Sequence, residues 1–107
     1  MPKPVEVSEL LNRVGKKIFI EYYFDFKQLR DTYTSNADVV NRINESFTLK
    51  SKNSRTAKAK RIFMEGLEIE ALRIIVNSSH PSVDSVREQA KDILAKETRH
   101  TEEKIYV

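Results

Sequence analysis

The stretch that decides the fold is residues 16–31, which read KKIFIEYYFDFKQLRD. Over its first part every second residue is apolar, which is the period of a strand. Four apolar residues also recur at the spacing of helical turns: Ile18, Tyr22, Phe26 and Leu29. The local pattern leaves both possibilities open, but a strand needs partners, and the only other strand-like pieces are 47–49 and 105–107. We therefore predict a helix over 16–31 that is buried on most of its circumference.

The composition of the whole chain also favours helices. Its 107 residues include two glycines and three prolines, fewer turn signals than a protein of many short strands needs. A chain of this length has room for one hydrophobic core. We predict one all-α domain, a compact bundle of five or six short helices, with its core in about residues 8–97 and a frayed tail over 98–107.

Helix boundaries on the N-terminal side follow from capping residues. Ser8 is predicted to cap a first helix, which ends or bends at Gly15. Ser35 and Asp38 have the spacing of a capping box, with Asp in the place of the usual Glu or Gln. They predict a further helix over about 36–46.

The C-terminal half is predicted to hold the remaining helices. Residues 48–53 are polar and are expected to form a loop, after which Ser54 caps a long helix. The apolar face of that helix consists of Ala59, Ile62, Phe63, Gly66, Leu67, Ala71, Ile74 and Ile75. Gly66 predicts that the helix bends there or that two helices meet. Residues 77–81 break the pattern before a last helix that runs from about Ser82 and fades by Glu97.

Positive charge is concentrated in residues 50–61, which read KSKNSRTAKAKR. Six of the 19 cations of the chain lie in this basic segment and none of its 16 anions, so the rest of the chain carries a net charge of −3. A local basic segment on a slightly acidic domain creates a directed field that attracts an anionic partner.

This basic segment is predicted to bind the phosphate backbone of DNA or RNA, through a loop and a helix N-terminus, without catalysing a reaction. Lysine and arginine neutralise phosphate, and the free N–H groups at a helix start attract it. Ser, Thr and Asn add neutral hydrogen bonds, and Asn53 and Arg55 could also read base edges. The candidate contact residues are Lys50, Lys52, Asn53, Arg55, Thr56, Lys58, Lys60 and Arg61.

Several alternatives remain open from the sequence. The basic segment can be an ordinary solvated helix face or a surface for an acidic protein. The chain can be a protein-protein interaction module or a homodimerising domain that binds no nucleic acid.

The two helices around residues 47–53 resemble a helix-turn-helix, although a connection of about seven residues is longer than the standard turn. Aromatic residues between 19 and 26 are expected to pack in the core rather than to stack on bases, with one or two tyrosine hydroxyls at the surface.

Catalysis, metals and cofactors are not expected. His80 has Asp84 four residues further on but no activated nucleophile, and Glu97 with His100 forms one of the two Glu-x-x-His pairs that a di-iron bundle needs. The absence of cysteine excludes disulfides and thiolate metal sites. No apolar run exceeds three residues, so neither a membrane span nor a secretory signal is predicted, and we expect a cytoplasmic location.

Three stretches of the chain carry a resemblance to known proteins. They are VGKKIFIEYYFDF at 14–26, SNADVVNRI at 35–43 and NSRTAKAKRIFMEGLEIEALRIIVNSS at 53–79. In this order they resemble a small bacterial helical domain of unknown function that occurs alone or appended to restriction-type nucleases. The similarity spans about residues 8–95 and consists mainly of a Gly-x-x-x-Phe and an Arg-x-x-x-Ala/Lys-Arg-Ile-x-x-x-Gly pattern. It implies a helical accessory module that works near DNA, and it transfers no catalytic residue, because the nuclease motifs lie outside such a module.

Overall fold

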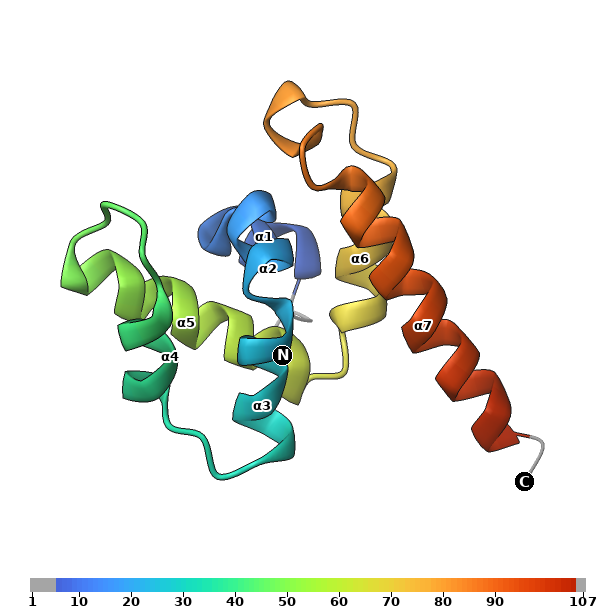
Figure 1. The fold of residues 1–107 in the computed structure, drawn as a ribbon, viewed down its shortest axis with the longest axis horizontal. Helices are drawn as coiled ribbons and strands as arrows, with labels where there is room; N and C mark the ends of the chain where they lie inside the picture. The colour runs from blue at the N-terminus through green and yellow to red at the C-terminus, as the bar shows by residue number, and fades with distance from the viewer. Residues whose placement is uncertain (1–5, 106–107) are drawn as a thin grey trace, which may run out of the picture.

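The computed structural model describes the backbone of residues 6–105 and the side chains of residues 6–99. This part of the chain forms helices and contains no strand (Figure 1). The helices are α1 (Val7–Val14), α2 (Lys16–Glu21), α3 (Tyr23–Asp31), α4 (Asn36–Arg42), α5 (Leu49–Met64), α6 (Glu68–Val76), the 3₁₀ turn η1 (Pro81–Val83) and α7 (Arg87–Ile105). The prediction of an all-α bundle is therefore confirmed, and its α-helices number seven within residues 6–105 because two predicted helices are each divided.

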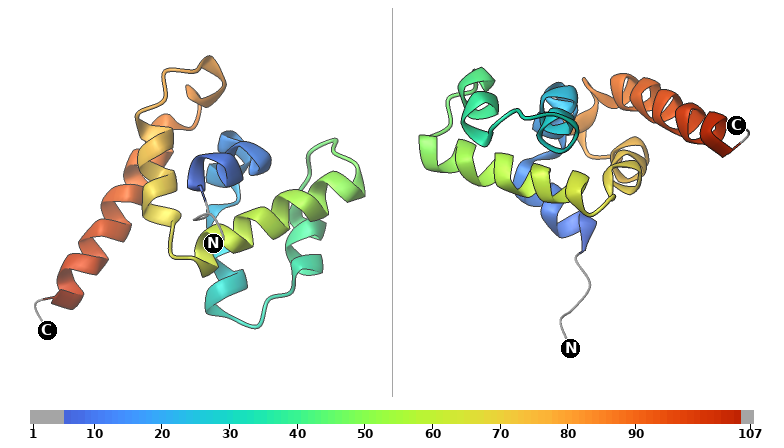
Figure 2. Two further views of the ribbon diagram at one scale, coloured as in Figure 1. Left: turned by 180° about the vertical axis from the view of Figure 1, so that it is seen from behind. Right: turned by 90° about the horizontal axis from the view of Figure 1, so that it is seen from below.

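Helix α5 packs against α1, α3 and α4, and these four helices form the larger part of the bundle. Helices α6 and α7 lie side by side on the other side of the molecule (Figures 1 and 2). In the right-hand view of Figure 2, α5 lies between α3 and α4 on one side and α1 on the other. The face of α5 that carries Asn53, Ala57 and Arg61 is exposed.

Residues 16–31 are helical, as predicted, but they form two helices rather than one. The chain leaves helical geometry at Tyr22, which has φ −113° and ψ 23°. The hydroxyl of Tyr22 accepts a 3.1 Å hydrogen bond from the Asn44 N–H and donates one of 3.1 Å to Glu45. Six side chains of this stretch are buried: Ile18, Phe19, Ile20, Tyr23, Phe26 and Leu29. Burial on most sides is confirmed, and the two helices provide the backbone pairing that an isolated strand would have lacked.

Helix α1 starts earlier than predicted and ends where predicted. It begins at Val7, after Glu6, so Ser8 lies inside the first turn and does not cap the helix. Gly15 ends α1 with a φ of 92°, a conformation that glycine adopts without steric cost. Its N–H donates a 2.9 Å hydrogen bond to the carbonyl oxygen of Leu11.

The predicted capping box of α4 is present. The Ser35 hydroxyl accepts the Asp38 N–H at 3.2 Å, and the Asp38 carboxylate accepts the Ser35 N–H at 3.1 Å. This bond from the backbone of Ser35 lowers the pKa of Asp38. Helix α4 ends at Arg42 rather than near residue 46, because Ile43 has extended backbone and buries its side chain in the core.

The predicted loop over 48–53 is wrong, since α5 already begins at Leu49. The hydroxyl of Thr48, not that of Ser54, caps the helix by accepting the Ser51 N–H at 3.1 Å. The interruption expected at Gly66 is confirmed: this residue has a φ of 71°, and α5 and α6 meet there as separate helices.

The break after α6 is confirmed, but the last helix differs from the prediction. Residues 81–83 form the 3₁₀ turn η1, and α7 begins at Arg87 rather than near Ser82. It continues to Ile105, well past Glu97. The guanidinium of Arg87 donates hydrogen bonds of 2.8 and 3.2 Å to the carbonyl oxygen of Ser78, which joins the start of α7 to the end of α6. The side chains of 100–105 and all of residues 106–107 lie outside the described part.

Most of the predicted core is buried. Phe63, Ile75, Phe26 and Ile43 are at most 2% exposed. Leu67 and Ile74 are only partly buried, and Leu72, which the predicted face omitted, is fully buried in their place. The rings of Phe19, Phe26 and Phe63 form the centre, with Phe19 stacked at 6.4 Å on Phe26 and at 5.8 Å on Phe63.

Candidate nucleic-acid interface

All eight predicted contact residues lie on one helix, α5. The predicted loop is therefore wrong, because Lys50 and Lys52 belong to the first turn of this helix. Successive residues of an α-helix are rotated by about 100° around its axis. The side chains of the basic segment therefore point in all directions, and the fold divides them into an inward and an outward set.

The inward set consists of Lys52, Arg55 and Thr56. Thr56 is fully buried, and its hydroxyl oxygen has no hydrogen-bond partner among the described residues. Lys52 is half-buried, and its ammonium donates a 2.8 Å hydrogen bond to the carbonyl oxygen of Ile43, at the end of α4. Each of the three would have to leave its present position in the fold before it could contact a ligand.

Arg55 holds three parts of the chain together. Its Nη1 donates a 2.7 Å hydrogen bond to the carbonyl oxygen of Val14, the last residue of α1. Its Nε donates to the Ser51 hydroxyl at 3.0 Å, and its guanidinium carbon lies 3.9 Å from the centroid of the Phe47 ring. The last carbonyl groups of a helix lack partners and carry partial negative charge, so a cation is stabilised there. Arg55 is therefore a structural residue, although the sequence placed it among the phosphate contacts and as a possible reader of base edges.

The outward set consists of Lys50, Asn53, Lys58, Lys60 and Arg61. Lys50, Asn53 and Arg61 are exposed, together with Ser54 and Ala57 between them. Lys58 and Lys60 are half-buried and lie on opposite flanks of this face, since residues two apart on a helix point about 160° away from each other. The outward face thus has small and polar residues along its middle and a lysine on each side.

The positive charge of the basic segment is not neutralised by ion pairs. Within the described residues, seven ion pairs have nitrogen and oxygen atoms within 4.0 Å, and none of them includes a cation of residues 50–61. Lys52 and Arg55 are bound to carbonyl groups, which carry no net charge. The outward face therefore combines accessible cations with an uncompensated charge.

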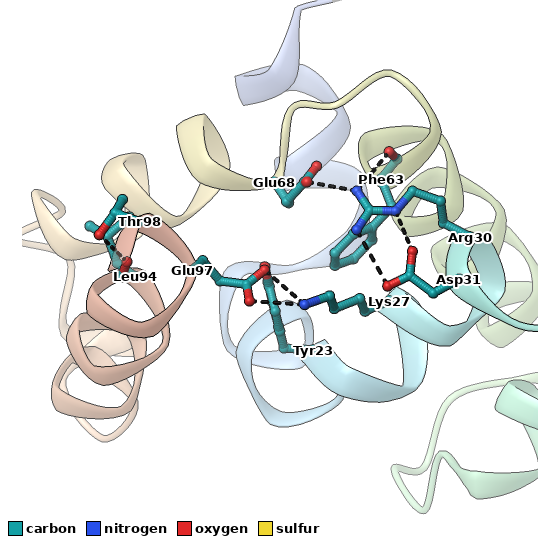
Figure 3. A network of polar contacts seen from close by, with 9 residues as sticks. All are labelled: Tyr23, Lys27, Arg30, Asp31, Phe63, Glu68, Leu94, Glu97 and Thr98. Carbon is teal, nitrogen blue, oxygen red and sulfur yellow. Dashed lines mark hydrogen bonds and ion pairs between the residues drawn. The ribbon is translucent and has the colours of Figure 1, made fainter. Parts of the chain in front are cut away.

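Two polar networks join α3 to the α6 and α7 pair, and sequence reasoning missed both (Figure 3). In the first, Glu97 of α7 accepts the hydroxyl of the buried Tyr23 at 2.8 Å and the Lys27 ammonium at 2.9 Å. Burial, and then the hydrogen bond to Glu97, raise the pKa of Tyr23. Tyr23 and Lys27 are one helical turn apart, which shows that they can share a partner, but no local signal connects them to Glu97.

The second network centres on Arg30. Its Nη1 donates a 2.7 Å hydrogen bond to Glu68 at the start of α6, and its Nε donates one of 2.7 Å to Asp31. The guanidinium carbon lies 5.5 Å from the centroid of the Phe63 ring. The hydrogen bond to Asp31, followed by that to Glu68, raises the pKa of Arg30, which stays charged. Both networks attach helices to each other.

The connection between α4 and α5 differs from the predicted one. It spans residues 43–48 and is shorter than the seven residues expected. Phe47 packs against the core, whereas Leu49, the first residue of α5, is 67% exposed. The aromatic residues between 19 and 26 are in the core as predicted, except that Phe24 is 54% exposed.

His80, at which no catalysis is expected from the sequence, has a local structural contact. The Nδ1 atom of His80 lies 2.7 Å from the Ser82 hydroxyl and accepts the Ser82 N–H at 3.1 Å, which caps η1. Asp84 pairs with Arg87 at 2.8 Å. No group of three or more His, Cys, Asp or Glu side chains suited to a metal ion occurs in the described part, and the side chain of His100 lies outside it.

Among the described residues, no helix is both long and apolar enough to cross a lipid bilayer. A scan against protein-family models, a search of curated proteins and a search of solved structures each found no match for this chain.

Proposed function

We propose that this chain is a non-catalytic nucleic-acid-associated domain that binds the phosphate backbone through the outward face of α5. The observation that carries the proposal is the set of four accessible or half-accessible cations on one helix, Lys50, Lys58, Lys60 and Arg61, without a carboxylate within ion-pair distance. An ordinary solvated helix usually carries acidic residues among its basic ones, but α5 contains none.

The arrangement suits a polyanion better than a single small anion. Lys50 and Arg61 are eleven residues apart, which is about 16 Å along a helix axis. A ligand that contacts all four cations must therefore carry several negative charges along its length. The backbone of a nucleic acid does so, and the release of its counterions provides the free energy of binding.

The proposal assigns different roles to the eight residues of the basic segment. Lys50, Lys58, Lys60 and Arg61 contact phosphates, and Asn53 donates or accepts neutral hydrogen bonds. Lys52, Arg55 and Thr56 stabilise α5 and its neighbours and do not touch the ligand. The resemblance to the bacterial helical domain adds the expectation of a helical accessory module that works near DNA.

A fluorescence anisotropy titration with a labelled 20-base-pair DNA duplex tests the proposal. Four phosphate contacts give a slope of about −4 in a plot of log affinity against log salt concentration, measured between about 50 and about 200 mM salt. The double variant Lys58→Glu with Arg61→Glu should nearly abolish binding. The matched control is Lys91→Glu with Lys96→Glu, which makes the same change in net charge on exposed positions of α7.

Circular dichroism should show unchanged helix content for both double variants. Arg61, Lys91 and Lys96 are exposed, Lys58 is in no ion pair within the described residues, and surface substitutions shift stability by about 0.5 kcal/mol or less. Equal affinity of the two double variants, or no binding by the parent chain, would overturn the proposal. The protein-protein interaction module would then be the better description, and sedimentation would test whether the chain pairs with a second copy.

A further inference from the structure

We infer that the ligand of the outward face is duplex DNA, that α5 enters the major groove, and that Asn53 reads the bases. This inference rests on the proposed function and makes it more specific. It follows from the order of side chains around α5, which differs between the middle of the outward face and its two flanks.

The middle turns of the outward face are slim, whereas its long exposed side chains, Lys50, Arg61 and Met64, lie nearer the two ends of α5. Asn53, Ser54 and Ala57 are exposed in the middle turns, and Ser54 and Ala57 have side chains of one or two heavy atoms. Small residues let the backbone of a helix come close to a surface. An α-helix with its side chains is about 10–12 Å wide, and the major groove of B-form DNA is about 12 Å wide, so a helix with a slim outward face fits into it.

The flanks of the same face carry cations at the same level of the helix. Lys58 and Lys60 point to opposite sides of α5, and both are half-buried, as expected for residues at the border of an exposed face. A helix in the major groove has a phosphate backbone on each side. One lysine can then contact each backbone, while Lys50 and Arg61 contact phosphates nearer the two ends of α5.

Other nucleic acids fit this face less well. The major groove of duplex RNA is deep and narrow, and side chains cannot read it. Single-stranded nucleic acid is usually bound by aromatic rings that stack on bases. The exposed aromatic rings Phe24 and Tyr33 belong to α3 and the loop after it, and the outward face of α5 contains none.

Asn53 is the one amide side chain on the outward face, and in the middle turns of α5 it is the one exposed side chain that can pair with a base through two hydrogen bonds, because Arg61 lies nearer the C-terminal end. In the major groove, the amide nitrogen of an asparagine can donate a hydrogen bond to N7 of adenine while its amide oxygen accepts one from the N6 amino group. This is the usual bidentate contact of asparagine with adenine. Arg55, the other base reader that the sequence predicted, is held at Val14 and Phe47 instead. Asn53 is therefore the expected specificity-determining residue, and Ser54 adds a hydroxyl beside it.

The first experiment compares three labelled probes of one sequence: duplex DNA, duplex RNA and single-stranded DNA. We expect the affinity for duplex DNA to be at least about 10-fold higher than for either other probe at the same salt concentration. Equal or stronger binding of duplex RNA or single-stranded DNA would overturn the inference but leave the proposed function intact. No binding to any probe would overturn both.

The second experiment identifies the reader. A pool of DNA duplexes with a randomised centre is selected for binding to the parent chain. The affinity for the enriched sequence is then compared with the affinity for versions in which one adenine at a time is replaced by another base. Asn53→Ala should remove about 10-fold discrimination at one adenine and leave binding to unselected DNA nearly unchanged. The control Gln89→Ala, an exposed amide on α7, should leave the preference intact. No enriched sequence, or the same preference in Asn53→Ala as in the parent, would overturn the assignment of Asn53.

Discussion

The guanidinium of Arg55 donates a 2.7 Å hydrogen bond to the carbonyl oxygen of Val14, a residue that precedes it by 41 positions. A cation from the most basic segment of the chain thereby caps the C-terminus of α1, and the same guanidinium stacks on Phe47. Arg55 therefore has a structural role, whereas Lys50 and Arg61 on the same helix are exposed to solvent.

Removal of this contact should destabilise the fold. Arg55→Ala leaves the Val14 carbonyl without its charged partner and removes the stacking on Phe47, so we expect a loss of about 2 kcal/mol in the free energy of unfolding, measured with urea. Arg61→Ala on the outward face is the matched control and should change it by less than about 0.5 kcal/mol. Equal losses in the two variants would contradict the structural role of Arg55.

Gly15 should tolerate a side chain poorly for two reasons. Its φ of 92° and ψ of 123° lie in a region that other residues rarely adopt, and an added Cβ would lie 2.9 Å from Nη1 of Arg55. The guanidinium can move away only if its hydrogen bond to the carbonyl oxygen of Val14 breaks. We expect Gly15→Ala to cost about 3 kcal/mol, the upper end of the range for backbone strain.

Gly66→Ala provides the comparison for Gly15. Gly66 has a φ of 71°, and nothing lies within 4 Å of an added Cβ, so this substitution should cost only the backbone strain, about 1–2 kcal/mol. When Gly15→Ala is combined with Arg55→Ala, the loss should be smaller than the sum of the single losses, because both changes disrupt the same contact. Strict additivity in urea denaturation would argue against the coupling of the two residues.

Phe63 should be among the most sensitive core positions. It is 1% exposed and touches the rings of both Phe19 and Tyr23, with centroid distances of 5.8 and 5.1 Å. Phe63→Ala leaves a cavity among these rings and should cost about 3–5 kcal/mol in chemical denaturation. A loss below about 1 kcal/mol would mean that this face of α5 does not form the centre of the core.

Tyr23 should make the stability fall at alkaline pH. Its pKa is raised above the ordinary value of 10.0 by burial and by the hydrogen bond to Glu97, so the folded state keeps the phenol proton where the unfolded state loses it. The contribution of Tyr23 to the free energy of unfolding is complete below pH 10 and decreases above it, by up to about 1.4 kcal/mol per pH unit.

Urea denaturation between about pH 9 and about pH 11 measures this effect. Tyr23→Phe should flatten the alkaline decrease, although it also removes a hydrogen bond and lowers the stability at neutral pH. Tyr33→Phe changes a fully exposed ring and should keep the slope of the parent chain. An identical slope in Tyr23→Phe and the parent chain would show that the proton of this phenol is not linked to folding.

Features that depend on near neighbours in the chain could be predicted from the sequence. The capping box of Ser35 and Asp38, the end of α1 at Gly15 and the interruption at Gly66 follow from local backbone preference and short-range hydrogen bonds. The helices over 16–31 were predicted because the rest of the sequence offers few partner strands. Local preference was insufficient where two residues offer the same chemistry. Thr48 and Ser54 both carry a capping hydroxyl, and the helix begins at the earlier one, so the polar stretch between them is helical rather than a loop.

The sequence by itself determined an all-α chain and a run of six cations without an anion, because composition and helical periodicity are properties of the chain alone. Only the tertiary structure decided which of these cations remain available. Lys52 and Arg55 share the stripe of α5 that contains Ala59 and Ile62, so packing against α1 and α4 turns them inward, where the carbonyl groups of Ile43 and Val14 accept their hydrogen bonds. Those carbonyls belong to helix ends that lie 9 and 41 residues away in the chain, and such contacts leave no periodic signal. The networks of Glu97 with Tyr23 and of Glu68 with Arg30 depend in the same way on where α6 and α7 pack, which no local pattern specifies.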